Sequence, residues 1–169
     1  MRMSDAADVF AYSKDPAVAQ HVLWEPHRSI SDSRGYLRFM LRQYRNGFPS
    51  SYGIVLKETG RLIGTIGFMN FSPENASTEI GYSLHRSYWN QGLMTEALQA
   101  VMTMAFRCLR VHRVEALHET SNPQSGRVMQ KCGMTREGTL RGKFLNKGQY
   151  VYVDLYAILR PEWEVLTTP

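Results

Sequence analysis

One short stretch of the sequence combines residues that could bind a phosphate group. Tyr88–Ala97 (YWNQGLMTEA) follows a predicted strand, Thr78–Leu84, and precedes a predicted helix that ends near Leu109. Gly92 lies at this strand-to-helix corner, where the lack of a Cβ lets the backbone come close to a ligand. The unpaired N–H groups of a first helical turn and the positive end of the helix dipole favour an anion there. The corner is a candidate anion site, although any strand–turn–helix crossover needs a small residue and Gly92 alone does not decide.

A second motif follows some 25 residues later. Asn122-Pro123 is typical of a helix start, because asparagine is a favoured N-cap residue and proline fits the first helical position. The helix is expected to run to Lys131–Cys132 and to end at Gly133, which suits a left-handed C-cap.

Composition sets the broad class of the protein. A chain of 169 residues with 43% apolar content fits a single globular domain, residues 1–169, with a proper core. No stretch approaches the roughly 20 apolar residues of a membrane helix, and the N-terminus shows no secretory signal. The two cysteines form no metal or redox spacing, so a reduced, cytoplasmic setting is expected. His112 and His118 could share one face of a strand, but a zinc site would need more ligands, and no metal is expected.

The net charge is +5 and the pI about 9.4, which suits an anionic ligand or partner. This balance does not choose between a nucleotide, a nucleic acid and an acidic protein. A predicted helix from Ser31 to near Gly47 carries a stripe of arginines on a face separate from its apolar stripe: Arg34, Arg38, Arg42 and Arg45. Such a stripe is either a solvated face or a surface for an acidic partner, and both readings stay open.

Hydrophobic periodicity predicts the elements that position these motifs. After short N-terminal helices and the arginine-bearing helix, three strands form a meander: Tyr52–Lys57, Leu62–Phe71 and Thr78–Leu84. Val111–Glu119 follows a helical crossover and is expected to lie parallel to the third of these strands. Beyond the Asn-Pro helix we expect a short strand at Met134–Glu137, a mobile loop at Gly138–Gly148 and a long strand at Tyr150–Leu159. This order predicts a mixed α/β domain.

Read together, the segments TEIGYSLHRSYWNQGLMTEAL and SNPQSGRVMQKCGM resemble the GNAT family of N-acetyltransferases. The similarity is greatest to the RimJ/RimL branch, whose members acetylate the N-termini of ribosomal proteins. The family's acetyl-CoA loop, Q/R-x-x-G-x-G/A, is matched within Trp89–Ala97. The family's helix of the form N-x-x-A/S-…-K-x-G-F is matched by Asn122, Ser125, Lys131, Gly133 and Met134.

The resemblance implies the GNAT fold: a central, mostly antiparallel sheet with a splayed parallel strand pair, and helices on both faces. The family's first strand is short or missing here. Acetyl-CoA is the implied co-substrate, with its diphosphate on backbone N–H groups of Gln91, Gly92, Leu93, Met94 and Thr95. Its pantetheine arm would run beside Ser83 and Leu84, and Asn122 would contact the arm or the leaving sulfur. Two residues depart from the branch: Met94 replaces a small residue and Asn90 replaces glycine.

The resemblance also suggests catalytic residues. Glu79 lies on the central strand where RimL-like enzymes are thought to use a glutamate base, and burial would raise its pKa toward the working range. Its alternative role is an exposed strand residue or an ion-pair partner. Many relatives protonate the leaving thiolate with a tyrosine, but that position is Met129 here. Ser125 is the substitute candidate, with a plain helix-surface serine as the alternative.

The expected function is transfer of an acetyl group from acetyl-CoA to a primary amine, by direct attack in a ternary complex. The acceptor implied by the resemblance is a protein N-terminus, such as that of a ribosomal protein. A polyamine or aminoglycoside acetyltransferase is the alternative. A basic nucleic-acid- or ribosome-associated module without catalysis is a further hypothesis from a different class. Nucleic acid is disfavoured because no aromatic–basic RNA signature accompanies the charge. No membrane contact is expected, and a homodimer stays open.

Overall fold

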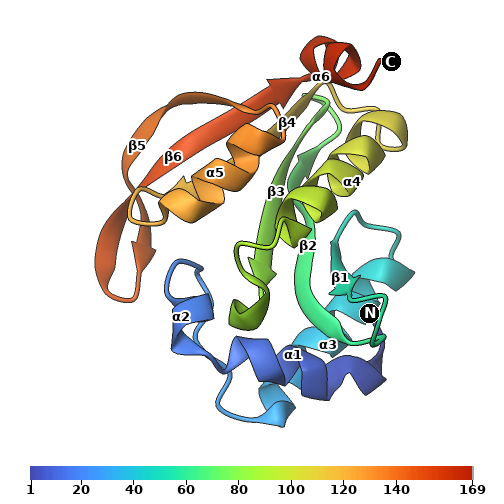
Figure 1. Ribbon diagram of the computed structural model, residues 1–169, viewed down its shortest axis with the longest axis vertical. Coiled ribbons are helices and arrows are strands. Elements are labelled where there is room, and N and C mark those ends of the chain that lie inside the picture. Colours follow the sequence, from blue (N-terminus) through green and yellow to red (C-terminus); the bar gives the residue numbers. More distant parts are fainter. Residues whose placement is uncertain (169) are drawn as a thin grey trace. The chain divides into compact units, whose positions relative to one another are not determined.

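The computed structural model describes residues 1–168 (Figure 1). Its helical elements are η1 (Met3–Asp5), α1 (Ala6–Ser13), α2 (Pro16–Ala19), α3 (Ile30–Arg45), η2 (Arg86–Tyr88), α4 (Leu93–Arg107), α5 (Pro123–Lys131) and α6 (Arg160–Thr167). Its strands are β1 (Ser51–Val55), β2 (Leu62–Ser72), β3 (Ser77–Leu84), β4 (Arg113–Glu119), β5 (Thr135–Asn146) and β6 (Gln149–Leu159).

The strands form one hydrogen-bonded sheet in the order β1-β2-β3-β4-β6-β5. The pairs β1–β2, β4–β6 and β5–β6 are antiparallel, whereas β3 and β4 are parallel. Helix α4 connects β3 to β4, because parallel neighbours need a long crossover. The parallel register covers only Ser77–Glu79 against Arg113–Glu115, although β3 continues to Leu84 and β4 to Glu119. The predicted mixed α/β fold, mostly antiparallel with a splayed parallel pair, is confirmed.

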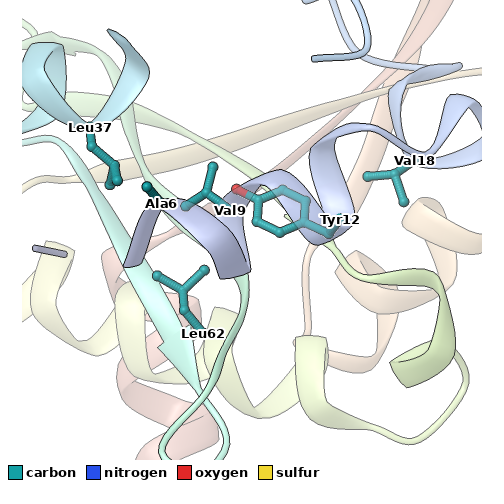
Figure 2. Close-up of a cluster of buried hydrophobic side chains, with 6 residues drawn as sticks. All are labelled: Ala6, Val9, Tyr12, Val18, Leu37 and Leu62. Atoms are coloured by element: carbon teal, nitrogen blue, oxygen red, sulfur yellow. The ribbon is translucent and has the colours of Figure 1, made fainter. Parts of the chain in front are cut away.

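Contacts between Cα atoms divide the chain into two compact units, the first made of Met1–Gly67 and Tyr82–Leu93. Its core is a cluster of buried side chains from α1, α2, α3 and β2, drawn in Figure 2: Ala6, Val9, Tyr12, Val18, Leu37 and Leu62. The three α1 residues of this cluster follow one another at intervals of three, so they share the inner face of the helix. Trp89, beyond β3, is partly buried against the same cluster.

Both ends of helix α3 carry residues that are typical of helix termini. Ser29 is the N-cap, and the Asp32 carboxylate accepts from the Ser29 N–H at 2.9 Å, which completes a capping box. Gly47 adopts φ +71° just beyond the last turn, as a left-handed C-terminal residue should. Leu37 and Met40 are buried on the inner face. The sequence prediction for this helix is therefore correct to within a residue or two.

The second unit comprises Phe68–Gly81 and the chain from Met94 onward. Helix α5 packs on β4, β5 and β6, as Figure 1 shows for the orange helix. Helix α6, which the sequence did not predict, stacks Trp163 on Phe106 of α4 with ring centroids 4.9 Å apart. An Arg160 Nη2 donates to the carbonyls of Phe106 and Val111, both at 2.7 Å, so α6 closes over the end of the crossover.

The segment expected as a loop, Gly138–Gly148, is instead mostly strand. β5 extends to Asn146 and pairs with β6 down to Asn146 opposite Gln149. Lys147 and Gly148 form a two-residue turn with φ of +48° and +81°, the left-handed pair that a tight hairpin requires. The pairing of β5 with β6 shifts register twice, and the glycine-rich sequence of β5 is consistent with these irregularities.

Candidate functional site

The turn between β3 and α4 is held by hydrogen bonds from its own side chains. The indole Nε1 of Trp89 donates to the Leu84 carbonyl at 2.8 Å, and Gln91 Nε2 donates to the Ser87 carbonyl at 2.8 Å. Asn90 and Gly92 both adopt left-handed backbone conformations, with φ of +60° and +80°. Alternation of left-handed residues in a turn produces a concave run of N–H groups, the geometry that binds anions.

Position 92 favours glycine because its backbone is left-handed, and not because a side chain there would clash with its neighbours. A Cβ built at this position has no heavy atom within 4 Å, so the space above the glycine is open to a ligand. Asn90 explains one departure from the family pattern, because asparagine is the side-chain-bearing residue that best tolerates the left-handed region. Gln91 and Gly92 are exposed, and α4 begins immediately after them at Leu93. The turn is therefore exposed and precedes a helix, and its role as an anion site stays a prediction.

The other departure, Met94, has a structural explanation in α4. Its side chain is buried, with 7% of its surface exposed, so it is one of the core residues of the protein. Thr95 follows in the first turn, and its carbonyl accepts a weak hydrogen bond from Cys132 Sγ at 3.6 Å. This contact joins the start of α4 to the end of α5.

Ser83 and Leu84, the predicted pantetheine contacts, lie at the end of β3. A Cβ on Gly64 of β2 would come within 2.4 Å of the Ser83 carbonyl oxygen, so that glycine permits the close approach of the two strands. The Ser83 hydroxyl is 3.3 Å from Thr65 Oγ1, which is 3.4 Å from the buried Tyr12 hydroxyl. Burial raises the pKa of Tyr12, so this phenol stays neutral and the chain of hydroxyls carries no charge.

Glu79 lies on β3 at the last position of the parallel register, directly opposite Glu115 of β4. Its pKa is raised, chiefly by burial, and the nearby Glu115 carboxylate raises it further. A hydrogen bond from Asn70 Nδ2 to Glu79 Oε2 at 2.9 Å and the charge of Lys143 act in the opposite direction. The partly buried carboxyl group therefore loses its proton at a higher pH than a free glutamate.

Asn122 and Ser125 come together at the start of α5. Asn122 occupies the N-cap position, but its side chain makes no capping bond to the backbone; Nδ2 donates instead to Ser125 Oγ at 3.1 Å. The expected capping role of the side chain is thus wrong, and the two polar side chains act as a pair. This pair and the Glu79–Asn70 pair are separate hydrogen-bond groups within the second unit.

His118 is a buried residue next to this helix that sequence reasoning did not assign to the site. Its Nδ1 lies 2.7 Å from the Glu119 carbonyl, which can only accept, so Nδ1 carries a proton. Its Nε2 is buried without a hydrogen-bond partner in the described residues and lies 3.9 Å from Asp154 Oδ2. Gly126 of α5 faces the ring, since a Cβ there would stand 2.6 Å from Nε2. The even spacing of His112 and His118 hinted at a metal, but packing explains His118.

Next to His118, Glu119 is a buried carboxylate at the end of β4, with 8% of its surface exposed. It accepts hydrogen bonds from Asn146 Nδ2 at 2.5 Å and from Ser121 Oγ at 3.3 Å. A glutamate at the end of an alternating strand gives no sequence signal of burial, so this group could be found only from the structure. It ties the β5–β6 turn to the segment that leads into α5.

Residues 1–168 contain no group of three or more histidine, cysteine, aspartate or glutamate side chains placed to hold a metal ion. Within the same residues, no helix has both the length and the apolar character needed to cross a bilayer.

Comparison with known proteins adds independent evidence. A family model described as "Acetyltransferase (GNAT) domain" matches residues 1–135. An uncharacterised N-acetyltransferase, p20 from Bacillus licheniformis, is 31% identical over 163 residues, covering 96% of this chain and 92% of that protein. The ribosomal-protein-serine acetyltransferase of Escherichia coli K12 is 33% identical over 131 residues, 77% of this chain and 72% of that protein. A GNAT-family acetyltransferase structure from Bacillus anthracis superposes with TM-score 0.84 at 27% identity, covering 94% and 91% of the two chains.

Proposed function

This chain belongs to the GNAT family of acetyltransferases, and from that membership we propose that it acetylates the N-terminal α-amino group of a protein. GNAT enzymes transfer an acetyl group from acetyl-CoA to an amine, so the enzyme class and the co-substrate follow from the family. The acceptor and the residue roles below are our proposal. A relative named as a ribosomal-protein-serine acetyltransferase supports a protein acceptor, and the cytoplasm is the proposed compartment.

The observation that carries the proposal is the shape of the turn at Asn90–Gly92. Two left-handed residues lie in an exposed turn that leads directly into the N-terminus of a 15-residue helix, where the helix dipole is positive. We assign the diphosphate of CoA to N–H groups of Gln91, Gly92, Leu93, Met94 and Thr95. Ser83 and Leu84 would contact the pantetheine arm. Since the Leu84 carbonyl already accepts from Trp89, its remaining capacity is one lone pair.

The chemistry requires that an ammonium group lose a proton before it attacks the thioester carbonyl. We assign this step to Glu79, directly or through a water molecule, because burial raises its pKa toward that of an effective base. After the tetrahedral intermediate collapses, the thiolate of CoA leaves and takes up a proton. Ser125, held by Asn122 through a 3.1 Å hydrogen bond, is the proposed donor; it would take up the proton that the attacking nitrogen releases, so that the serine ends the step as a neutral hydroxyl. Thiolate is a good leaving group, so loss of Ser125 should slow turnover without abolishing it.

Cofactor binding is tested by the thermal shift that acetyl-CoA produces, since a ligand selective for the native state must raise the melting temperature. We expect Gly92→Val to abolish the shift. Gly60→Val is the matched control, because Gly60 also has a left-handed φ, +68°, and open space around its Cβ position. Both variants should lose roughly 1–2 kcal/mol of stability, but only Gly92→Val should lose the response to acetyl-CoA. An unchanged shift in Gly92→Val contradicts the assignment.

The acceptor is tested by following CoA thiol release with a panel of N-terminal peptides, polyamines and aminoglycosides. We expect turnover with peptides that carry a free α-amino group and none with the same peptides after N-terminal blocking. Glu79→Gln should lower kcat while retaining the acetyl-CoA thermal shift, because glutamine keeps the bond to Asn70 and loses the base. Turnover with polyamines alone would replace the protein acceptor by a small amine, and full activity of Glu79→Gln would remove Glu79 from the mechanism.

A further inference from the structure

Strand β2 departs from regular strand geometry near its end, at Met69 and Asn70. Asn70 has a left-handed backbone, with φ of +48°, although it lies inside β2. Successive side chains of a regular strand point to opposite faces of the sheet, yet Met69 and Asn70 are both exposed. A left-handed residue inside a strand is typical of a bulge, which changes the direction of a side chain.

Both side chains reach the same face of the neighbouring strand, β3. A Cβ on Gly81 would lie 2.5 Å from Met69 Sδ, so Met69 covers Gly81. Asn70 Nδ2 donates to Glu79 Oε2 at 2.9 Å. Glu79 and Gly81 are alternate residues of β3 and therefore share one face. Two consecutive residues of β2 thus contact one face of β3, which a regular strand does not do.

The irregular backbone is itself held by β3. The Thr78 side chain is buried, and its hydroxyl donates to the Met69 carbonyl at 3.1 Å. That carbonyl belongs to the peptide group before Asn70, and the orientation of this group sets the φ of Asn70. Asparagine is among the side-chain-bearing residues that best tolerate a left-handed backbone. The strand that carries the proposed base therefore also fixes the residue that contacts the base.

We propose that Asn70 is a positioning residue for Glu79: its amide holds one carboxylate oxygen, so that the other oxygen faces the amine or the water that gives up a proton. The inference rests on the proposed function, in which Glu79 is the base, and adds a residue to that site. A carboxylate only accepts hydrogen bonds, so the amide group of Asn70 is the donor. The bond favours the ionised carboxylate, which is the form that a base needs.

The charged groups near Glu79 come from two other strands of the second unit. Burial is the largest influence on the pKa of Glu79 and raises it, and the hydrogen bond from Asn70 is the largest influence that lowers it. Glu115 of β4, itself paired with Arg113, raises this pKa, whereas Lys143 of β5 lowers it. Asn70 thus opposes the effect of burial, and its removal should raise the pKa of Glu79.

The first test needs no acceptor: the Glu79 carboxyl carbon is titrated by carbon-13 NMR and assigned with Glu79→Gln. Asn70→Gly removes the amide and keeps the left-handed backbone at no steric cost. One hydrogen bond to a carboxylate changes its pKa by roughly one unit, so the pKa of Glu79 should rise by about that amount. Asn70→Asp should raise it further, because a second carboxylate of the same size as the amide repels the first.

The matched control is Asn75→Gly, which removes a 2.9 Å hydrogen bond from Asn75 Nδ2 to Ser72 Oγ in the same hairpin. We expect this variant to titrate as the wild type does. A Glu79 titration that is unchanged in Asn70→Gly, or that moves equally in Asn75→Gly, overturns the role of Asn70 and leaves the proposed function intact.

The second test is the pH profile of kcat/KM with a peptide that the wild type acetylates. The acid limb should move with the titration, so that Asn70→Gly is about tenfold slower below it, with the KM for acetyl-CoA unchanged. A merely structural role would lower the rate by one factor at every pH. A limb that stays in place although the titration moves removes both Asn70 and Glu79 from the proton transfer. If the wild type acetylates no amine, the proposed function fails and this role fails with it.

Discussion

Because Gly126 lies against His118, the effect of Gly126→Ala on stability should depend on the residue at position 118. We expect it to destabilise the wild type and to stabilise a His118→Ala variant. In the wild type, Gly126→Ala would place a Cβ 2.6 Å from His118 Nε2, 3.2 Å from Cε1 and 3.3 Å from Cδ2. The ring has little freedom to move away, because Nδ1 is held 2.7 Å from the Glu119 carbonyl and the ring packs against Tyr156 at 5.5 Å. We therefore expect overpacking, which typically destabilises by about 1–3 kcal/mol.

An opposing effect of known size acts at the same position. Alanine is better than glycine in a helix interior by up to about 1 kcal/mol, so the net loss in the wild type should be up to about 2 kcal/mol. In a His118→Ala background the overpacking is absent and only the helix propensity remains. There Gly126→Ala should stabilise the protein by up to about 1 kcal/mol.

Urea unfolding at pH 7 of the four proteins in this double-mutant cycle measures both values. For a chain of 169 residues each kcal/mol corresponds to about 2–4 °C in Tm, so thermal melts provide a second reading. The m-value should stay constant, since the change is in the native packing. If Gly126→Ala destabilises to the same extent in both backgrounds, the imidazole does not set the position of α5 and our account of this glycine is wrong.

Three further predictions concern ionisable groups. Burial raises the pKa of Glu79 in the folded state above its ordinary value of 4.5. Between pH 4.5 and this raised pKa the folded protein therefore binds more protons than the unfolded chain, so stability falls as pH rises through this range. Glu79→Gln should therefore gain stability relative to the wild type between pH 4.5 and 7 in urea unfolding, and a constant difference would contradict this. The hydrogen bond from Arg136 lowers the pKa of Asp154 to about 2, so its stabilisation is present above pH 3.8 and is lost as pH falls toward 2. Arg136→Gln should lower stability slightly at pH 6, since Arg136 is exposed and its ion pair is screened by solvent, with the difference vanishing near pH 2; a difference that persists there would count against the pair. Burial raises the pKa of Cys132 to about 11, whereas Cys108 is exposed; iodoacetamide at pH 8 should label Cys108 far faster, and equal labelling by mass spectrometry would refute that.

Features that depend on a few neighbouring residues could be predicted from the sequence. The predicted helix from Ser31 to near Gly47 agrees with α3 to within a residue or two, and Asn122-Pro123 marks the start of α5. The same holds for the turn at Gly92, where a strand, a glycine and a helix are adjacent in the chain. Each of these is a local backbone requirement that one residue type satisfies.

The features that could not be predicted depend on contacts between distant residues. The polar, glycine-rich segment after Glu137 has low strand propensity, and it is a strand because β6 pairs with it. The Lys147-Gly148 turn was the available signal for that hairpin. The orientation of the Asn122 side chain toward Ser125, and the burial of His118 against Gly126, follow from the packing of α5 on β4. No spacing in the sequence encodes that packing.

The turn before α4 has a consequence for how the enzyme responds to its own product. Its shape is fixed by bonds within the chain, from Trp89 to Leu84 and from Gln91 to Ser87, so it exists before any nucleotide arrives and little ordering entropy is lost on binding. In the proposed mode of binding the turn contacts only the diphosphate, which is the same in CoA and in acetyl-CoA. Free CoA should therefore compete with acetyl-CoA on nearly equal terms, and the ratio of the two in the cell would set the rate.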